Sequence, residues 1–143
     1  MTIAVDFDGT IVEHRYPEIG KEIPFAITAL KRLQAEHHRL ILWTVREGQL
    51  LTEAIEFCQQ RGLEFFAVNS NYPDEQPLDK LSGSCRKLDA DVYIDDRSLG
   101  GLPDWGVIYN VIHEKKSFER YWKEVFLGGE AKKKSLWKRL LGK

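Results

Sequence analysis

The sequence predicts an α/β fold, with a mostly parallel sheet of about five strands in three layers and helices on both faces. Short continuous apolar runs alternate with stretches that have helical spacing, which is the pattern of such sheets. With 143 residues and 43% hydrophobic content, the chain is long enough for one core and too short for two ordinary domains. We therefore expect a single domain over residues 1–128, followed by a tail over residues 129–143.

The first half of the chain shows this alternation clearly. Thr2–Val5 is apolar and short enough for a strand, and a helix is expected to begin near Pro24, because proline is favoured in a first turn. The apolar stripe of that helix consists of Ala26, Ile27, Leu30 and Leu33. Arg39–Trp43 is a continuous apolar run typical of a strand buried on both faces, and it ends at Thr44.

The second half continues the pattern. Glu47–Arg61 is predicted as a helix that stops at Gly62, since glycine commonly follows a helix end. The other predicted elements are strands at Phe65–Val68, Val92–Ile94 and Val107–Tyr109, a short helix at Leu81–Arg86 and an amphipathic helix at Ser117–Phe126.

Composition restricts the class of protein. No apolar stretch is long enough to span a bilayer, and the N-terminus lacks the segments of a secretory signal, so we expect a cytoplasmic protein without stable membrane insertion. The two cysteines, Cys58 and Cys85, have neither the number nor the spacing of a disulfide framework. From Glu130 onward there are six Lys or Arg residues and one Glu. This basic tail could contact an anionic membrane or nucleic acid, or simply be solvated.

Polar residues follow three of the predicted strands. Asp6, Thr44 and Asp95 each stand at the end of an apolar run, and ligands of open parallel sheets bind at the carboxyl ends of the strands. A carboxylate can attack phosphorus directly, so Asp6 is the candidate nucleophile, and Asp8 is the candidate general acid and base. Mg²⁺ is the expected cofactor, with Asp6 and Asp95 as ligands and Asp96 ranked below them.

Thr44, Arg46 and one lysine are candidates for binding phosphate. The Thr44 hydroxyl can hydrogen-bond a phosphate oxygen, and the Arg46 guanidinium matches phosphate geometry. A lysine is also needed to balance the crowded negative charge, and both Lys80 and Lys87 are available.

These residues resemble the four motifs of the haloacid dehalogenase superfamily of phosphatases, in order over about the first 110 residues. Asp6–Thr10 is similar to its first motif and Leu40–Thr44 to its second. The resemblance favours Lys87 over Lys80, because Lys87 lies shortly before Val92–Asp96, which is similar to the fourth motif. It implies a Rossmann-like sheet, an aspartyl-phosphate at Asp6, proton transfer by Asp8, and the Asp8 backbone carbonyl as a Mg²⁺ ligand.

Family members often carry a cap domain, inserted either after the first motif or after the third strand. Neither Ile11–Arg39 nor Asn69–Arg86 has room for one here. The expected site is therefore open. Such a site could accept a phosphate on a large substrate, or a partner in an oligomer could close it. The class of the phosphorylated substrate stays open. His14, Arg15, Tyr16, Asn71 and Tyr72 are weak candidates for specificity.

Two other classes of function remain. A signalling receiver that is phosphorylated on an aspartate has a similar composition. In receivers, however, the acidic pair precedes the phospho-acceptor residue in the sequence, whereas here an acidic pair comes last. A noncatalytic phosphate- or partner-binding module, with the basic tail as its working part, is the main alternative.

Overall fold

The computed structural model describes residues 1–74, 87–117 and 119–125. The chain divides into two compact units, Met1–Gly106 and Val107–Lys143, and each is described by itself. The first unit contains a parallel sheet and two helices, which confirms the predicted α/β class. No cap domain is present in the part of the chain that the structure describes.

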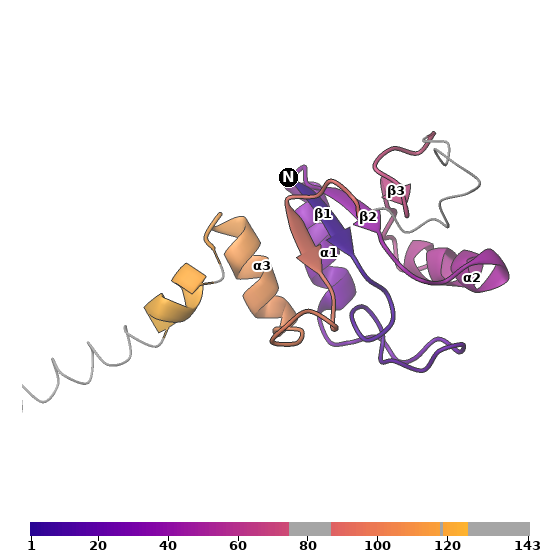
Figure 1. Ribbon diagram of the computed structural model, residues 1–143, viewed down its shortest axis with the longest axis horizontal. Coiled ribbons are helices and arrows are strands. Elements are labelled where there is room, and N and C mark those ends of the chain that lie inside the picture. Colours follow the sequence, from indigo (N-terminus) through magenta and orange to yellow (C-terminus); the bar gives the residue numbers. More distant parts are fainter. Residues whose placement is uncertain (75–86, 118, 126–143) are drawn as a thin grey trace, which may run out of the picture. The chain divides into compact units, whose positions relative to one another are not determined.

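The sheet has four strands in the order β3-β2-β1-β4, and all neighbouring pairs are parallel (Figure 1). The strands are β1 (Thr2–Val5), β2 (Arg39–Leu42), β3 (Ala67–Val68) and β4 (Val92–Ile94). In register, Val5 of β1 is aligned with Leu42 of β2 and with Ile94 of β4. The three strands therefore end side by side, and the residues that follow them begin at one edge of the sheet.

Burial explains why β1 lies inside the sheet. Ile3, Ala4 and Val5 are fully buried, as are Ile41 and Leu42 of β2, so these strands have apolar side chains on both faces. Ala4, Ile41, Ala67 and Leu88 form one cluster, against which Trp43, Ala90 and Tyr93 pack. This rigid centre supports the loops that carry the polar residues.

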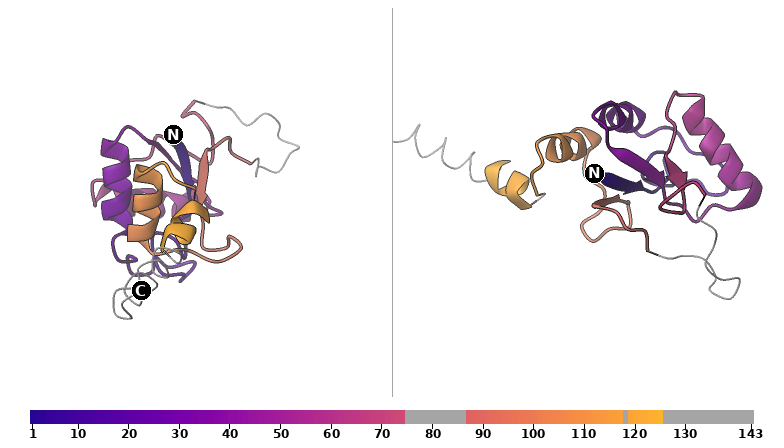
Figure 2. Two further views of the ribbon diagram at one scale, coloured as in Figure 1. Left: turned by 90° about the vertical axis from the view of Figure 1, so that its left-hand side faces the viewer. Right: turned by 90° about the horizontal axis from the view of Figure 1, so that it is seen from above.

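Two helices of the first unit connect consecutive strands. They are α1 (Ala26–Ala35) and α2 (Gly48–Gln59), and both lie on the same side of the sheet in the right-hand view of Figure 2. Right-handed crossovers from β1 to β2 and from β2 to β3 require this, since both steps move in one direction along the sheet. The apolar stripe of α1 that the sequence predicts is buried: Ala26, Ile27, Leu30 and Leu33.

The predicted fifth strand is wrong. Val107–Tyr109 lies inside α3 (Trp105–His113), a helix that begins at the end of the first unit. Trp105, Ile108 and Ile112 are buried and follow the spacing of one helical face, which a three-residue apolar window does not reveal. Farther on, residues 119–125 are helical, within the predicted helix Ser117–Phe126.

Several predictions fall outside the described residues: the short helix Leu81–Arg86, the alternative lysine Lys80, Cys85 and the basic tail 129–143. Among the helices that the structure describes, none has the length and apolar character needed to cross a membrane. The cytoplasmic location stays a prediction.

Candidate functional site

A cleft of about 480 Å³ lies at the carboxyl ends of the strands. It brings together three residues that the sequence places after different strands, namely Asp6 after β1, Thr44 after β2 and Asp95 after β4. The described residues that line the cleft are Asp6, Asp8, His14, Tyr16, Trp43, Thr44, Val45, Asp95 and Arg97. The cleft therefore combines carboxylates and a hydroxyl with aromatic and cationic side chains.

Three carboxylates form an acidic cluster at this cleft. Asp6, Asp95 and Asp96 each offer an oxygen, and these atoms all lie within 4.8 Å of one another. Asp96 Oδ1 is buried and has no hydrogen-bond partner among the described residues, so it lacks the compensation that a buried carboxylate oxygen needs. An all-oxygen set with a free buried oxygen fits a hard cation such as Mg²⁺.

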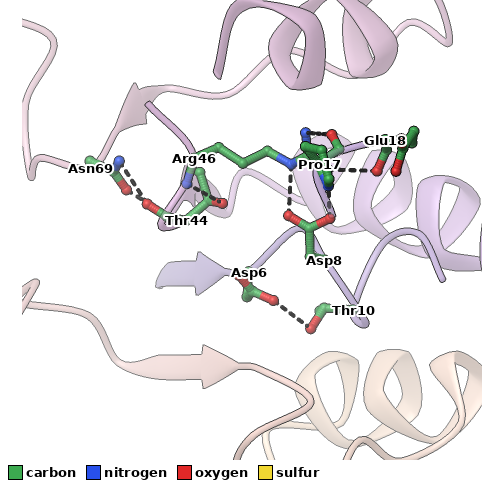
Figure 3. A network of polar contacts seen from close by, with 8 residues as sticks. All are labelled: Asp6, Asp8, Thr10, Pro17, Glu18, Thr44, Arg46 and Asn69. Carbon is green, nitrogen blue, oxygen red and sulfur yellow. Dashed lines mark hydrogen bonds and ion pairs between the residues drawn. The ribbon is translucent and has the colours of Figure 1, made fainter. Parts of the chain in front are cut away.

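The loop after β1 is tied to the loop after β4 through Thr10. Its hydroxyl donates to Asp6 Oδ2 at 3.2 Å (Figure 3). The same hydroxyl accepts a hydrogen bond from the Asp96 backbone N–H at 3.0 Å. The Trp105 indole Nε1 donates to the Thr10 carbonyl at 3.0 Å, and both residues are buried. Thr10 thus fixes the distance between Asp6 and the acidic pair.

Gly9 allows this close approach. Its φ is +87°, and a Cβ at this position would lie 2.2 Å from Asp96 Oδ2. Only glycine leaves that space and also adopts this backbone conformation at low cost. The Asp-Gly step is therefore part of the site geometry as well as a turn.

The Asp6 carboxyl is electrostatically unusual. Burial is the main cause that raises its pKa from 3.8 to about 7, against the opposing hydrogen bond from the Phe7 backbone. The charges of Asp95 and Asp96 also raise the pKa, while the Thr10 hydroxyl lowers it. A cation bound between these carboxylates would favour the ionised form that a nucleophile or ligand requires.

Asp8 is held by a buried arginine. Arg46 Nε donates to Asp8 Oδ2 and Arg46 Nη2 donates to Asp8 Oδ1, both at 2.7 Å. Arg46 is fully buried, and it also donates to the carbonyls of Pro17 at 2.9 Å and Glu18 at 3.0 Å. The buried positive charge of the guanidinium is compensated, because the Asp8 carboxylate and the two carbonyls surround it.

The structure thus gives Arg46 a place different from the predicted phosphate contact. Its guanidinium is engaged by Asp8 and is not part of the cleft lining. Figure 3 shows the two carboxylates of the first loop pointing apart, with Asp8 toward Arg46 and Asp6 toward Thr10. The Asp6 and Asp8 side chains are therefore in different environments although one residue separates them.

Thr44 is positioned by an asparagine after β3. The Thr44 N–H donates to Asn69 Oδ1 at 2.8 Å, and Asn69 Nδ2 donates to the Thr44 carbonyl at 2.9 Å. Asn69 has a φ of +52°, a conformation that asparagine tolerates better than most residues. The Thr44 hydroxyl accepts a hydrogen bond from the Arg46 N–H at 3.2 Å, so its own proton can be donated to a ligand.

The other predicted residues are distributed around the site. Lys87 Nζ lies over the Tyr93 ring, 5.2 Å from its centroid, and Lys87 is not part of the cleft lining that the structure describes. His14 and Tyr16 line the cleft. Arg15 instead forms an ion pair with Glu13, Asn71 binds the backbone of Asp89, and Tyr72 packs against Phe66.

Sequence reasoning did not assign a role to five residues that shape the site: Thr10, Trp43, Val45, Asn69 and Arg97. Asn69 and Arg97 carry a signal that could have identified them, since each follows a strand end closely, as Thr44 does. The sequence predicts Trp43 only as the last residue of a strand. Its place in the cleft depends on where β2 ends, at Leu42.

No protein-family model and no curated protein matches this chain. The solved structure of a conserved protein coded by a locus of Bacteroides thetaiotaomicron is similar, with 66% sequence identity and a TM-score of 0.73. The similarity covers 83% of this chain and 94% of that protein. The chain therefore belongs to the same family as this conserved Bacteroides thetaiotaomicron protein.

Proposed function

We propose that this protein is a Mg²⁺-dependent phosphohydrolase of the haloacid dehalogenase superfamily, which hydrolyses phosphomonoesters through an aspartyl-phosphate at Asp6. One observation carries the proposal. Asp6, Asp95 and Asp96 converge within 4.8 Å, at a cleft that Thr44 also lines. Carboxylates from two strand ends and a hydroxyl from a third are the groups that phosphoryl transfer on a carboxylate needs.

In the first proposed half-reaction, an Asp6 carboxylate oxygen bonds to phosphorus while the bond from phosphorus to the leaving oxygen breaks. The leaving oxygen takes a proton from Asp8. In the second, a water oxygen bonds to phosphorus, its proton passes to Asp8, and the bond between Asp6 and phosphorus breaks to release inorganic phosphate.

Mg²⁺ bound by Asp6, Asp95 and Asp96 would offset the negative charge of carboxylates and phosphate and polarise the phosphoryl group. Thr44 contributes a hydroxyl donor toward a phosphate oxygen. Asp8 lines the cleft while both of its carboxylate oxygens accept hydrogen bonds from Arg46, so the Arg46 side chain fixes where the proposed acid lies.

The test is phosphate release from a broad panel of phosphomonoesters by the purified full-length protein with Mg²⁺. We expect turnover that EDTA abolishes and that Asp6→Asn lowers by at least about a hundredfold, because the nucleophile is removed. Asp104→Asn is the matched control, since Asp104 is exposed and outside the described cleft lining, and its carboxylate accepts a hydrogen bond from the Gly106 N–H at the start of α3 that an asparagine side chain can also accept.

A second readout does not depend on finding a good substrate. A phosphate analogue that mimics a phosphorylated carboxylate, such as beryllium fluoride, should bind wild type with Mg²⁺ and should not bind Asp6→Asn. Absence of both turnover and this adduct in the wild type would rule out the proposed function.

A further inference from the structure

The cleft beside the acidic cluster has a wall of aromatic and apolar side chains. Trp43, Val45 and Tyr16 line it together with Asp6 and Asp95. Tyr16 is 50% exposed and Val45 is 67% exposed, so both present apolar surface to solvent. Exposed apolar side chains that gather next to a polar reaction site are typical of the part of a pocket that binds an organic group.

Trp43 is held in place before any ligand binds. Its ring contacts the Tyr93 ring edge to face, with centroids 5.4 Å apart, and it packs against the buried cluster of the sheet. The Tyr16 ring has a favourable contact as well, because the Arg46 guanidinium lies over it, 5.4 Å from its centroid. Rings that are already ordered lose little conformational freedom when a ligand stacks on them.

The polar groups of the cleft do not favour a sugar as the main group recognised. Carboxylates and amides commonly bind sugar hydroxyls, and no amide side chain is present among the described residues of the lining. Asp6 and Asp95 belong to the acidic cluster, and both oxygens of Asp8 accept hydrogen bonds from Arg46. The Trp43 and Tyr16 rings along the wall offer mainly aromatic surface, which suits a flat ring better than a row of hydroxyls.

The size of the cleft also limits the leaving group. Pockets for small organic ligands have volumes on the order of 300–1,000 Å³. The cleft of about 480 Å³ lies within this range. His14 and Arg97, both exposed at the cleft, add cationic or hydrogen-bonding groups that suit an anionic ester.

We infer that the substrate is a small phosphomonoester whose leaving group carries a flat aromatic ring, which stacks on Trp43 and Tyr16. This inference rests on the proposed function. Nucleoside monophosphates and phosphates of arylmethyl alcohols share this chemistry. A sugar phosphate without a ring of this kind lacks the group that the wall would bind.

Matched substrate pairs test the inference in the full-length protein with Mg²⁺. Adenosine and uridine 5′-monophosphates are compared with ribose 5-phosphate, which has the same phosphorylated carbon and no base. Benzyl phosphate is compared with cyclohexylmethyl phosphate, which has a ring that is not aromatic. We expect kcat/KM to be at least about tenfold higher for the aromatic member of one pair or both, as stacking of a base on an aromatic side chain allows.

Variants show which residues cause the preference for an aromatic leaving group. Trp43→Ala and Tyr16→Ala should each lower kcat/KM for the aromatic ester several-fold and leave the non-aromatic ester nearly unchanged, whereas Trp43→Phe should retain the preference. Tyr72→Ala is the control, because Tyr72 is an exposed aromatic residue outside the cleft lining. Tyr16 is half exposed, so its variant tests the wall even if Trp43→Ala does not fold.

The outcomes separate the two proposals. Equal kcat/KM within both pairs, or an equal loss for both members in the variants, would overturn the aromatic preference while hydrolysis itself stands. Absence of hydrolysis of every ester, together with absence of the phosphate-analogue adduct, would overturn the proposed function instead. A preference confined to one pair identifies which ring source the wall binds.

Discussion

Arg46 is the residue on which the geometry of Asp8 depends. It is fully buried, and its guanidinium makes two hydrogen bonds of 2.7 Å to Asp8 and two more to backbone carbonyls. Arg46 also lies over the Phe7 ring, 5.2 Å from its centroid. A single side chain thus holds the proposed acid, the loop at Pro17 and the start of the segment after β2.

Replacing Arg46 should therefore be costly. Arg46→Met leaves Asp8 buried without its charged partner, and we expect the free energy of unfolding to fall by about 3–5 kcal/mol. Chemical denaturation measures this change. Arg15→Met is the control from the same loop region, because its ion pair with Glu13 is long and exposed and contributes less than about 1 kcal/mol. Equal effects of the two substitutions would contradict the role of Arg46.

The raised pKa of Asp6 predicts an unusual pH dependence of the stability of the metal-free protein. Its pKa is raised from 3.8 to about 7, mainly by burial, so the folded state keeps a proton that the unfolded chain has already lost. This contribution to stability is fully present below pH 3.8 and is lost as the pH rises through about 7. The loss is on the order of 1–3 kcal/mol after solvent screening is allowed for.

Thermal unfolding in EDTA at pH 5 and pH 8 tests this. The wild type should lose several degrees of Tm between the two pH values, and Asp6→Asn should lose less, because an amide does not titrate. The same pH dependence in both proteins would show that Asp6 is not responsible.

At the scale of elements, the approach of the loop after β1 to the loop after β4 depends on Gly9. Gly9→Ala would place a Cβ 2.2 Å from Asp96 Oδ2 and would require a φ of +87° from alanine. We expect a loss of stability above about 2 kcal/mol together with loss of the proposed Mg²⁺ binding, since the acidic cluster must spread. Denaturation and metal titration provide the two readouts.

Gly48 is a matched control for this substitution. It also has a positive φ, +54°, but a Cβ there meets no atom within 4 Å. Gly48→Ala should therefore cost only about 1 kcal/mol of backbone strain and leave the site intact. A similar loss in both variants would mean that backbone strain, and not the contact with Asp96, decides the effect.

Strand ends can be predicted from the local sequence, whereas contacts between distant side chains cannot. Strand ends are local features, so the meeting of Asp6, Thr44 and Asp95 followed from apolar runs and the geometry of parallel sheets. The contact between Asp8 and Arg46 joins residues 38 positions apart, and nothing local indicates that the guanidinium turns to Asp8. The strand predicted at Val107–Tyr109 is wrong because three apolar residues fit a strand or a helix equally well.

At the scale of the whole molecule, the proposed metal site links the sheet to overall stability. Asp6 and Asp95 follow the adjacent strands β1 and β4, so an ion bound between them joins segments far apart in the sequence. A ligand that binds only the folded state at a hundredfold excess over its Kd stabilises it by about 2.7 kcal/mol. Mg²⁺ should therefore raise the Tm of the wild type.

Asp95→Asn should reduce or abolish this rise in Tm, because it removes a charged oxygen from the cluster. Asp104→Asn, away from the cluster, should keep the full response. Scanning calorimetry over a Mg²⁺ series provides the measurement. A Tm that does not respond to Mg²⁺ in the wild type would count against the metal site.

The hydrogen bond from Trp105 to Thr10 has a spectroscopic consequence. The indole donates to the residue whose hydroxyl binds Asp6, and the ring is buried. Indole emission responds to the electric field and hydrogen bonding around the ring. We therefore expect a change of charge at Asp6, by a proton, a metal ion or a phosphoryl group, to alter the emission of Trp105, to which Asp6 is connected through two hydrogen bonds of Thr10. Since the chain has four tryptophans, the part of the signal that Trp105→Phe removes would report occupancy of the candidate site without an added label.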